Sequence, residues 1–370
     1  MDSIVATPGR TPAWAAAATL VALLVAGPVP AIEPWTPRAP LLLGVLEPAV
    51  ASFEDKIYVA GGLIGGSTQD RVQVWDPATD TWSDAAPLPV GLNHAAAAAV
   101  GSELFVIGGW TDVGQTPVDL VYAYDPIGNA WTQKTSMPTA RGSPAAAVIG
   151  DEIYVVGGNP GRQDFAVYDV AQDSWTTLPD MPTGRHHMGA AFVDGLFYAV
   201  GGRAIQLPQE VNVDTVEIFD PVAETWSAGP PLPRPRSGIA VAALGRYVLA
   251  FGGEGNTAHP DGVFPDADAL DTAIGEWAGL ADMPVPRHGI SAGVLGGNVH
   301  IPGGGPVMSF SQTDHHDVYD TRSQLYTNVP LLGPLAVCAL VAALTAGVGV
   351  RRARRQTLKR KFTTSPSWMT

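Results

Sequence analysis

The chain has 370 residues, of which 46 % are hydrophobic and 15 % are charged, so it is long enough for one large all-β domain or two average ones. Its single cysteine, Cys338, excludes an intramolecular disulfide bond. Between Ile32 and Thr327 there are 13 basic and 34 acidic residues, a net charge of −21, which argues against a nucleic-acid partner because phosphates would be repelled.

The first segment of the chain, residues 1–31, predicts a secretory signal peptide. Arg10 precedes the apolar run Ala13–Ala26, which is shorter than the roughly 20 residues of a bilayer-spanning helix. Val29 and Ala31 then supply small residues at the third and first positions before a cleavage site that follows Ala31. An uncleaved membrane anchor is the alternative interpretation of the same segment.

From residue 32 to residue 327 the sequence repeats three markers at fixed offsets. The first marker is a glycine pair, which occurs six times with the first glycines 44 to 51 residues apart. A period of this length indicates a repeat architecture. The pairs are Gly61-Gly62, Gly108-Gly109, Gly157-Gly158, Gly201-Gly202, Gly252-Gly253 and Gly303-Gly304.

The other two markers lie at fixed sequence distances from the glycine pairs or from each other. A tryptophan lies 26 residues before each first glycine, at Trp35, Trp82, Trp131, Trp175, Trp226 and Trp277. An aromatic-Asp dipeptide begins seven residues before a tryptophan in the segments that start at Trp75, Tyr124, Tyr168 and Phe219. All length variation falls between the glycine pair and this dipeptide, so we expect a loop there, on one face of a rigid scaffold.

Each repeat has the composition of short β-strands. Four apolar or alternating runs, such as "GSPAAAVIG", "DEIYVVGG", "FAVYDV" and "SWTTL", are separated by turn-forming Gly, Pro, Asp and Asn. The three markers at these offsets resemble kelch repeats, and the resemblance covers about 290 residues. It implies an all-β fold, a six-bladed kelch β-propeller with four-stranded antiparallel blades, over residues 32–327.

We interpret the three markers as structural. The run before each glycine pair is expected to be an inner strand buried on both sides, where a side chain at the glycines would clash. The tryptophan is expected to wedge between neighbouring blades, and the Asp to bond backbone amides at a turn. Because the last repeat has only Tyr326 in place of a tryptophan, Trp35 is predicted to supply its fourth strand and close the ring.

A recurring arginine lies ten residues after the tryptophan in four repeats, where the first two repeats have Val45 and Leu92. The resemblance to kelch proteins places this position near the mouth of the central channel, where guanidinium groups could bind an anionic group. The alternative is that the arginines pair with acidic residues of the scaffold. The candidate ligand-binding set is Asn93, His94, Arg141, Ser143, Arg185, His186, His187, Arg236, Ser237, Arg287 and His288.

We predict no cofactor and no metal site. The segment Asp314-His315-His316-Asp317 has metal-ligand chemistry, but adjacent strand residues point to opposite faces, and we interpret it as a solvated turn. A looser acidic loop lacks the spacing of a calcium-binding loop, and no nucleophile elbow, P-loop or zinc motif is present. The residues of the acidic loop are Asp261, Asp266, Asp268 and Asp271.

Residues 328–350 predict a transmembrane helix, because Val329–Val350 carries no charge and would span about 33 Å. The basic cluster "RRARRQTLKRK" follows, which predicts a cytoplasmic tail over residues 351–370. A buried core helix is the alternative. The order of "VPLLGP", apolar span and arginines also resembles the C-terminal sorting tails of bacterial surface proteins, which a membrane protease removes.

These features predict a single-pass membrane protein whose kelch propeller lies outside the cytoplasm and binds a protein or a glycan through its loop face. The alternative that the resemblance offers is a periplasmic mutarotase or epimerase of sialic-acid-type sugars. Galactose-oxidase-like chemistry is excluded because it needs a cysteine crosslinked to tyrosine, and Cys338 lies in the predicted span. A ubiquitin-ligase adaptor would need an α-helical domain for which no residues remain.

Overall fold

The computed structural model describes residues 33–159, 163–206 and 209–323, which form short antiparallel strands joined by turns. The predicted signal peptide, transmembrane helix and cytoplasmic tail lie outside these residues. Within the described ranges, no helix combines the length and the apolar character that crossing a membrane requires.

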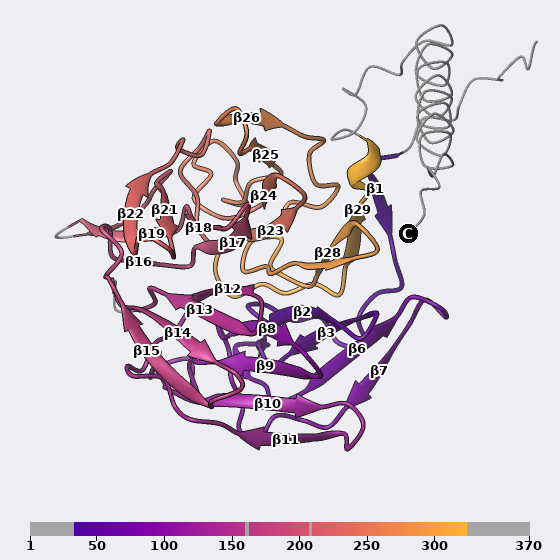
Figure 1. Cartoon of the computed structure of the whole chain (residues 1–370). Coiled ribbons are helices and arrows are strands. Elements are labelled where there is room, and N and C mark those ends of the chain that lie inside the picture. The colour runs from indigo at the N-terminus through magenta and orange to yellow at the C-terminus, as the bar shows by residue number, and fades with distance from the viewer. Residues whose placement is uncertain (1–32, 160–162, 207–208, 324–370) are drawn as a thin grey trace, which may run out of the picture. The chain divides into compact units, whose positions relative to one another are not determined.

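In the described part of the chain, six antiparallel sheets have four strands each (Figure 1). The prediction of an all-β fold made of four-stranded antiparallel sheets is confirmed. The first three are β2 (Ala49–Phe53), β3 (Lys56–Ala60), β6 (Val72–Asp76) and β7 (Thr81–Ala85); β8 (Ala96–Val100), β9 (Glu103–Ile107), β10 (Val121–Asp125) and β11 (Ala130–Gln133); and β12 (Ala145–Ile149), β13 (Glu152–Val156), β14 (Phe165–Asp169) and β15 (Ser174–Leu178).

The other three sheets follow the same order of strands, except that the last one takes its outer strand from the beginning of the chain. They are β17 (Gly189–Val193), β18 (Leu196–Val200), β21 (Val216–Asp220) and β22 (Thr225–Ala228); β23 (Ala240–Leu244), β24 (Tyr247–Phe251), β25 (Ala267–Asp271) and β26 (Glu276–Gly279); and β27 (Gly293–Leu295), β28 (Asn298–Pro302), β29 (His316–Tyr319) and β1 (Trp35–Pro37).

Smaller elements lie in the segments between the main strands. They are the three-stranded sheet of β16 (Arg185–His186), β19 (Arg203–Gln206) and β20 (Gln209–Asn212), and the hairpin of β4 (Leu63–Ile64) and β5 (Ser67–Thr68). The short helix η1 (Thr321–Ser323) follows β29.

The sheets close into a ring. Their innermost strands contact one another in the cyclic order β2, β8, β12, β17, β23, β27 and back to β2. Strand β1 pairs with β29, with Trp35 opposite Tyr319, so the start of the repeat region completes the last sheet. The prediction that Trp35 closes the ring is confirmed, and the pairing covers an edge that would otherwise be open to other chains.

The glycine pairs stand where sheets crowd together, as Gly157 and Gly158 after β13 show. Their φ angles are 65° and 119°, in the region that favours glycine. A Cβ atom on Gly157 would lie 2.5 Å from the carbonyl oxygen of Arg185 in the next repeat. Strand β13 itself is buried from Ile153 to Val156. The predicted inner strand, ended by glycines that avoid a clash, is therefore confirmed.

Each repeat tryptophan links its sheet to the preceding one. Every indole Nε1 donates to a backbone carbonyl oxygen at 2.8 to 3.0 Å, and each acceptor follows the preceding repeat tryptophan by four residues in the sequence. Six clusters of buried apolar side chains fill the space between neighbouring sheets. The predicted wedge role of the tryptophans is confirmed. The acceptors are Ala281, Ala39, Ala86, Thr135, Pro179 and Pro230.

The aromatic-Asp marker also has its predicted role. The Asp side chain of each repeat accepts a hydrogen bond from a backbone N–H two or three residues later. In the first five repeats this bond holds the turn into the outer strand, and in the last repeat it joins Asp320 to the short helix η1. The Asp residues are Asp76, Asp125, Asp169, Asp220, Asp271 and Asp320.

Two interpretations of loops were wrong. His316 and Asp317 are only 1 % and 4 % exposed, because they begin strand β29 instead of lying in a solvated turn. The His316 ring packs against the edge of Trp75, with ring centroids 4.9 Å apart. Asp268, assigned to a loose acidic loop, is buried in β25 and accepts a hydrogen bond from Arg236 at 2.7 Å.

Candidate ligand-binding site at the channel mouth

One residue in each repeat adopts the left-handed backbone conformation just before the innermost strand. These residues lie fourteen positions before the first glycine of each pair, and their φ angles fall between 52° and 63°. A non-glycine residue rarely takes this conformation, so four such residues at equivalent positions indicate that the fold imposes it. The mouth ring, as we name the six, is Glu47, His94, Ser143, His187, Gly238 and Gly289.

Backbone hydrogen bonds connect the mouth ring from sheet to sheet. The N–H of His94 donates to the carbonyl oxygen of Glu47 at 3.1 Å, and that of Ser143 to the carbonyl oxygen of His94 at 2.9 Å. The backbone at the mouth is therefore fixed by the repeat, whereas its side chains vary. The remaining links run from His187 to Ser143, Gly238 to His187, Ile290 to Gly238 and Glu47 to Gly289.

A second set of contacts brings the variable loops to the same place. In every repeat, the residue before the mouth-ring residue forms a β-bridge with the residue after the glycine pair. The predicted loop face and the predicted channel mouth are thus the same surface. The bridged pairs are Leu46 with Leu63, Asn93 with Trp110, Gly142 with Asn159, His186 with Arg203, Ser237 with Glu254, and His288 with Gly305.

A cavity of about 740 Å³ opens at this mouth. Trp110 and Phe310 contribute aromatic walls, and Glu47, His94 and His187 reach the cavity from the mouth ring. The same three side chains also border a much smaller space of about 50 Å³ on the channel side, so they form the floor of the cavity. The volume lies in the range of small-molecule sites, which combine apolar walls with a few convergent polar groups.

The structure brings part of the predicted candidate set together. Asn93, His94, His187 and His288 line the cavity, and Ser143 borders the smaller space beneath it. Two further candidates lie behind the surface: His186 and Ser237 are 1 % and 0 % exposed.

The four arginines do not line the cavity. Each is at most 1 % exposed and points into its own sheet, which favours the scaffold alternative over binding of an anionic ligand. Arg141 donates to the carbonyl oxygens of Val155 and Asp164. The others pair with acidic residues of the third strand, namely Arg185 with Glu217, Arg236 with Asp268, and Arg287 with Asp317.

Several cavity residues were absent from the predicted set. Glu47 was missed although its offset from Gly61 equals that of His94 from Gly108. Trp110, Arg203 and Glu254 were missed because each simply follows a glycine pair. A search for whatever residue follows the six pairs would have found them.

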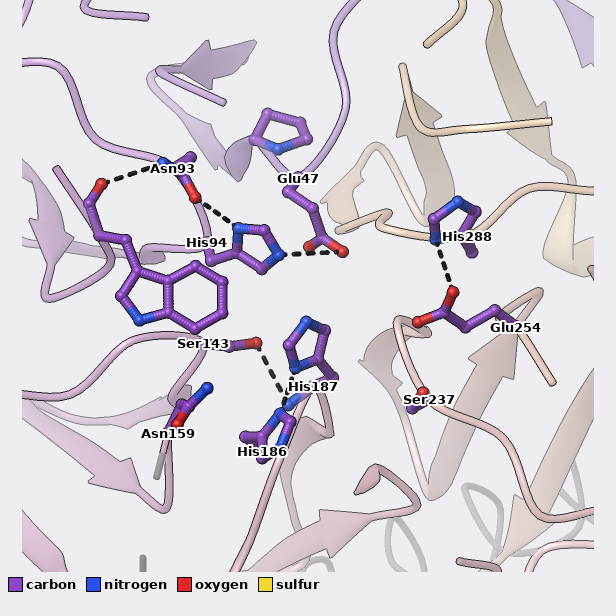
Figure 2. Close-up of polar contacts among 12 residues, drawn as sticks. Glu47, Asn93, His94, Ser143, Asn159, His186, His187, Ser237, Glu254 and His288 are labelled. Atoms are coloured by element: carbon purple, nitrogen blue, oxygen red, sulfur yellow. Dashed lines mark hydrogen bonds and ion pairs between the residues drawn. The ribbon is translucent and has the colours of Figure 1, made fainter. Parts of the chain in front are cut away.

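The floor of the cavity combines one carboxyl group with two imidazoles (Figure 2). Nε2 of His94 lies 3.4 Å from Oε1 of Glu47, and one ligand atom from each of Glu47, His94 and His187 lies within 4.8 Å of the others. Nδ1 of His94 lies 2.6 Å from Oδ1 of Asn93. The three groups come from three different repeats and meet only because the ring is closed.

Burial sets the charge of these groups. It raises the pKa of Glu47 to about 8, with the neighbouring charge of Glu254 adding to the effect and Arg203 opposing it. Burial also lowers the pKa of His94 and of His187 well below the usual range, reinforced by the other cationic groups around them. The floor therefore favours neutral imidazoles at neutral pH.

One wall of the cavity is an ionic network. Arg203 donates to Glu254 and also to Oγ of Ser237, the latter at 3.2 Å. The other carboxylate oxygen of Glu254 lies 3.4 Å from Nδ1 of His288. Charged groups that are already paired in this way can orient a polar ligand without the cost of an isolated buried charge.

Comparisons with known sequences point to one family. The family model described as the KLHDC2/KLHL20/DRC7 Kelch-repeats domain matches residues 93–304, and the Kelch motif matches residues 46–89. Kelch-like protein terF of Aspergillus terreus (strain NIH 2624 / FGSC A1156) is 41 % identical over 102 residues, which are 27 % of this chain and 22 % of that protein.

A second curated relative is Kelch-like protein 15 of Gallus gallus, 30 % identical over 106 residues, or 29 % of this chain and 20 % of that protein. The chain thus spans about a fifth of the length of these relatives. Among solved structures, that of YjhT aligns with a TM-score of 0.63 and 15 % identity, covering 75 % of this chain and 95 % of YjhT. This likeness supports the propeller-like fold and extends no further.

Proposed function

The chain belongs to the kelch-repeat family, and from this premise we propose that it is a binding module: a six-bladed kelch propeller, tethered to a membrane and exposed outside the cytoplasm, that captures a glycan or a protein at the mouth of its channel. Kelch propellers support many functions, so the proposal depends on the site more than on the fold.

The mouth cavity is the observation that carries the proposal. It measures about 740 Å³ and joins the aromatic side chains of Trp110 and Phe310 to the polar groups of Asn93 and Glu254. A sugar ring has apolar faces and hydroxyl groups at its edge, so such a cavity suits a glycan better than a flat protein surface. A protein ligand would have to insert a loop or a chain end.

Glycan binding is tested with the purified full chain and a panel of immobilised glycans. Wild type is expected to bind a subset of the panel, and Glu47→Gln or Trp110→Leu is expected to weaken binding at least tenfold. His259→Gln, a change at an exposed histidine outside the cavity lining, serves as the matched control. Binding that survives both mouth substitutions would contradict a site at the mouth.

The membrane tether is supported by sequence alone, through the apolar residues 328–350 and the basic residues that follow. Removing residues 328–370 is expected to move the protein from the membrane fraction to the soluble fraction. A protease that cannot cross the membrane, added to intact cells, is expected to cleave the propeller of the full chain, because the propeller is proposed to lie outside the cytoplasm. Retention of the shortened chain on membranes would contradict the tether.

A sugar mutarotase or epimerase is the second candidate function. The specific observation in its favour is that Glu47, His94 and His187 converge at the floor of a cavity large enough for a monosaccharide. Carboxyl and imidazole groups are the usual general acids and bases of ring opening. Anomer exchange of N-acetylneuraminic acid, followed by NMR, is expected to accelerate with wild type if this function holds, and an unchanged rate would exclude that substrate.

A further inference from the structure

The three residues at the floor of the cavity have the side-chain chemistry of a transition-metal site, and no local sequence motif predicts this site. Glu47, His94 and His187 each offer one ligand atom, and these atoms lie within 4.8 Å of one another. Zn²⁺ binds imidazole nitrogen and carboxylate oxygen at about 2.0–2.2 Å, so two of its ligands at the tetrahedral angle are about 3.4 Å apart. Nε2 of His94 and Oε1 of Glu47 already have that separation, 3.4 Å.

The surroundings of His94 fix which of its nitrogens carries the proton. The amide nitrogen of Asn93 donates to Thr68 Oγ1 at 2.8 Å and to the carbonyl oxygen of Trp110 at 3.1 Å, so its amide oxygen must face His94. That oxygen lies 2.6 Å from Nδ1 of His94 and can only accept. Nδ1 therefore carries the hydrogen, and Nε2 presents a lone pair toward Glu47.

Two successive contacts likewise determine which ring nitrogen of His187 carries the hydrogen. Nε2 of His186 lies 3.3 Å from a carboxylate oxygen of Glu210, which accepts its hydrogen. The Nδ1 of a neutral His186 is then an acceptor, and Nδ1 of His187 donates to it. Nε2 of His187 is left with a lone pair, and Figure 2 shows this nitrogen pointed toward Glu47 and His94.

Outer contacts of this kind are typical of metal-binding histidines. A ligating imidazole almost always donates its other N–H to a carboxylate, an amide or a similar acceptor, which fixes its tautomer and its orientation. Both histidines have such a partner, and the two lone pairs converge on one carboxyl group. The net charge of −21 between Ile32 and Thr327 also favours cations over anions.

We propose that Glu47, His94 and His187 bind a divalent transition-metal ion of the Zn²⁺ class, with an open coordination position that faces the mouth cavity. Two imidazoles and one carboxylate form a set that Zn²⁺ and neighbouring first-row metals accept. An oxygen atom of a ligand in the cavity could then complete the coordination. The metal site does not depend on the glycan proposal, because it can be measured with the metal alone.

Cobalt titration of the full chain tests the site directly. The purified protein is stripped with a chelator, dialysed and titrated with Co²⁺, whose visible absorption is intense when the ion is tetrahedral. Wild type is expected to bind a single equivalent, and Zn²⁺ is expected to displace it. Glu47→Gln and His94→Asn are each expected to weaken binding at least about 100-fold, the upper end of the loss seen for outer-shell partners.

His259→Gln is the matched control, because His259 is an exposed histidine 3.5 Å from Asp261 and would bind metal only adventitiously. It is expected to leave the titration unchanged. Equal binding by wild type and both floor variants, loss of binding in His259→Gln, or no absorption change in wild type would each overturn the proposal.

X-ray absorption of the Zn²⁺-loaded wild type removes any dependence on how the variants fold. A first shell with two imidazole nitrogens and carboxylate oxygen is expected. A shell made of oxygen atoms alone would also overturn the proposal.

Discussion

The interiors of the sheets and the mouth of the channel share one repeating backbone, but they use it differently. Inside the sheets, equivalent positions make equivalent contacts: six tryptophans donate to six carbonyl oxygens, and three arginines pair with acidic residues. At the mouth, the backbone of the ring is equally regular, yet its side chains are Glu, His, Ser, His, Gly and Gly. Side chains vary where stability does not depend on them, which is where a binding site can be built.

The largest expected effect comes from breaking a buried ion pair inside a sheet. Arg185→Met leaves Glu217 buried without its partner, and we expect the free energy of unfolding to fall by about 3–5 kcal/mol. The double variant Arg185→Met with Glu217→Leu is expected to recover part of that loss, because the carbonyl oxygens of Thr183, Ala199 and Gly201 still lose the donor that Arg185 provides. Urea denaturation measures both. A loss below about 1 kcal/mol in the single variant would return Arg185 to the candidate ligand-binding set.

Removing a tryptophan side chain that packs between two sheets is expected to lower the free energy of unfolding by slightly less. Trp131→Ala deletes an indole that packs against the first two sheets and donates to the carbonyl oxygen of Ala86 at 2.9 Å. We expect a loss of about 3 kcal/mol. Trp131→Phe, which keeps a six-membered aromatic ring but loses the pyrrole part of the indole with its N–H, serves as the control, and we expect it to lose about half as much. An equal loss in the two variants would mean that packing of the ring contributes little.

The pH dependence of stability has a source inside the sheets. Burial lowers the pKa of His300 from 6.5 to about 4, so the unfolded chain binds a proton more readily than the folded one between these values. This contribution to stability is full above pH 6.5 and is lost as the pH falls toward 4. We expect wild type to lose roughly 2 kcal/mol more than His300→Leu by pH 5, because other buried histidines such as His316 contribute to the pH dependence of both proteins. Identical pH profiles for the two proteins, from chemical denaturation, would contradict the assignment.

The smallest expected effect is at the mouth. Ser143→Gly places glycine where Gly238 and Gly289 already stand in their own repeats, so the left-handed backbone at φ 52° is relieved. The variant loses only the hydroxyl group that accepts from the N–H of His187 at 3.2 Å. We expect the free energy of unfolding to change by less than about 1 kcal/mol. A larger loss would mean that the mouth is part of the scaffold after all.

The same contrast explains what could be predicted from the sequence. Sheet interiors obey fixed offsets, so the strands, the wedge tryptophans and the closure by Trp35 followed from spacing. The arginines also repeat, but their residue type placed them in the candidate ligand-binding set, and the structure favours the scaffold alternative because all four are buried. Glu47, His94 and His187 lie 47 and 93 residues apart in the chain and share no motif, so only the closed ring shows that they meet.

Two local errors have one physical cause. His316 and Asp317 follow an exposed polar segment, and Asp268 lies among other acidic residues, so polarity suggested loops. Each side chain is instead buried beside a partner from another element, as Asp317 is beside Arg287 at 2.7 Å. Burial of a charged residue depends on a partner that the local sequence does not contain.

The claim that the channel mouth binds a glycan is tested most directly by a thermal-shift measurement on the purified full chain. The protein is measured with N-acetylneuraminic acid and with a panel of neutral sugars, in the presence and absence of a chelator. We predict a saturable rise in melting temperature with at least one sugar, lost in Glu47→Gln and kept in His259→Gln. A rise that persists in Glu47→Gln, or no rise with any sugar, would contradict the account of the mouth as a glycan site.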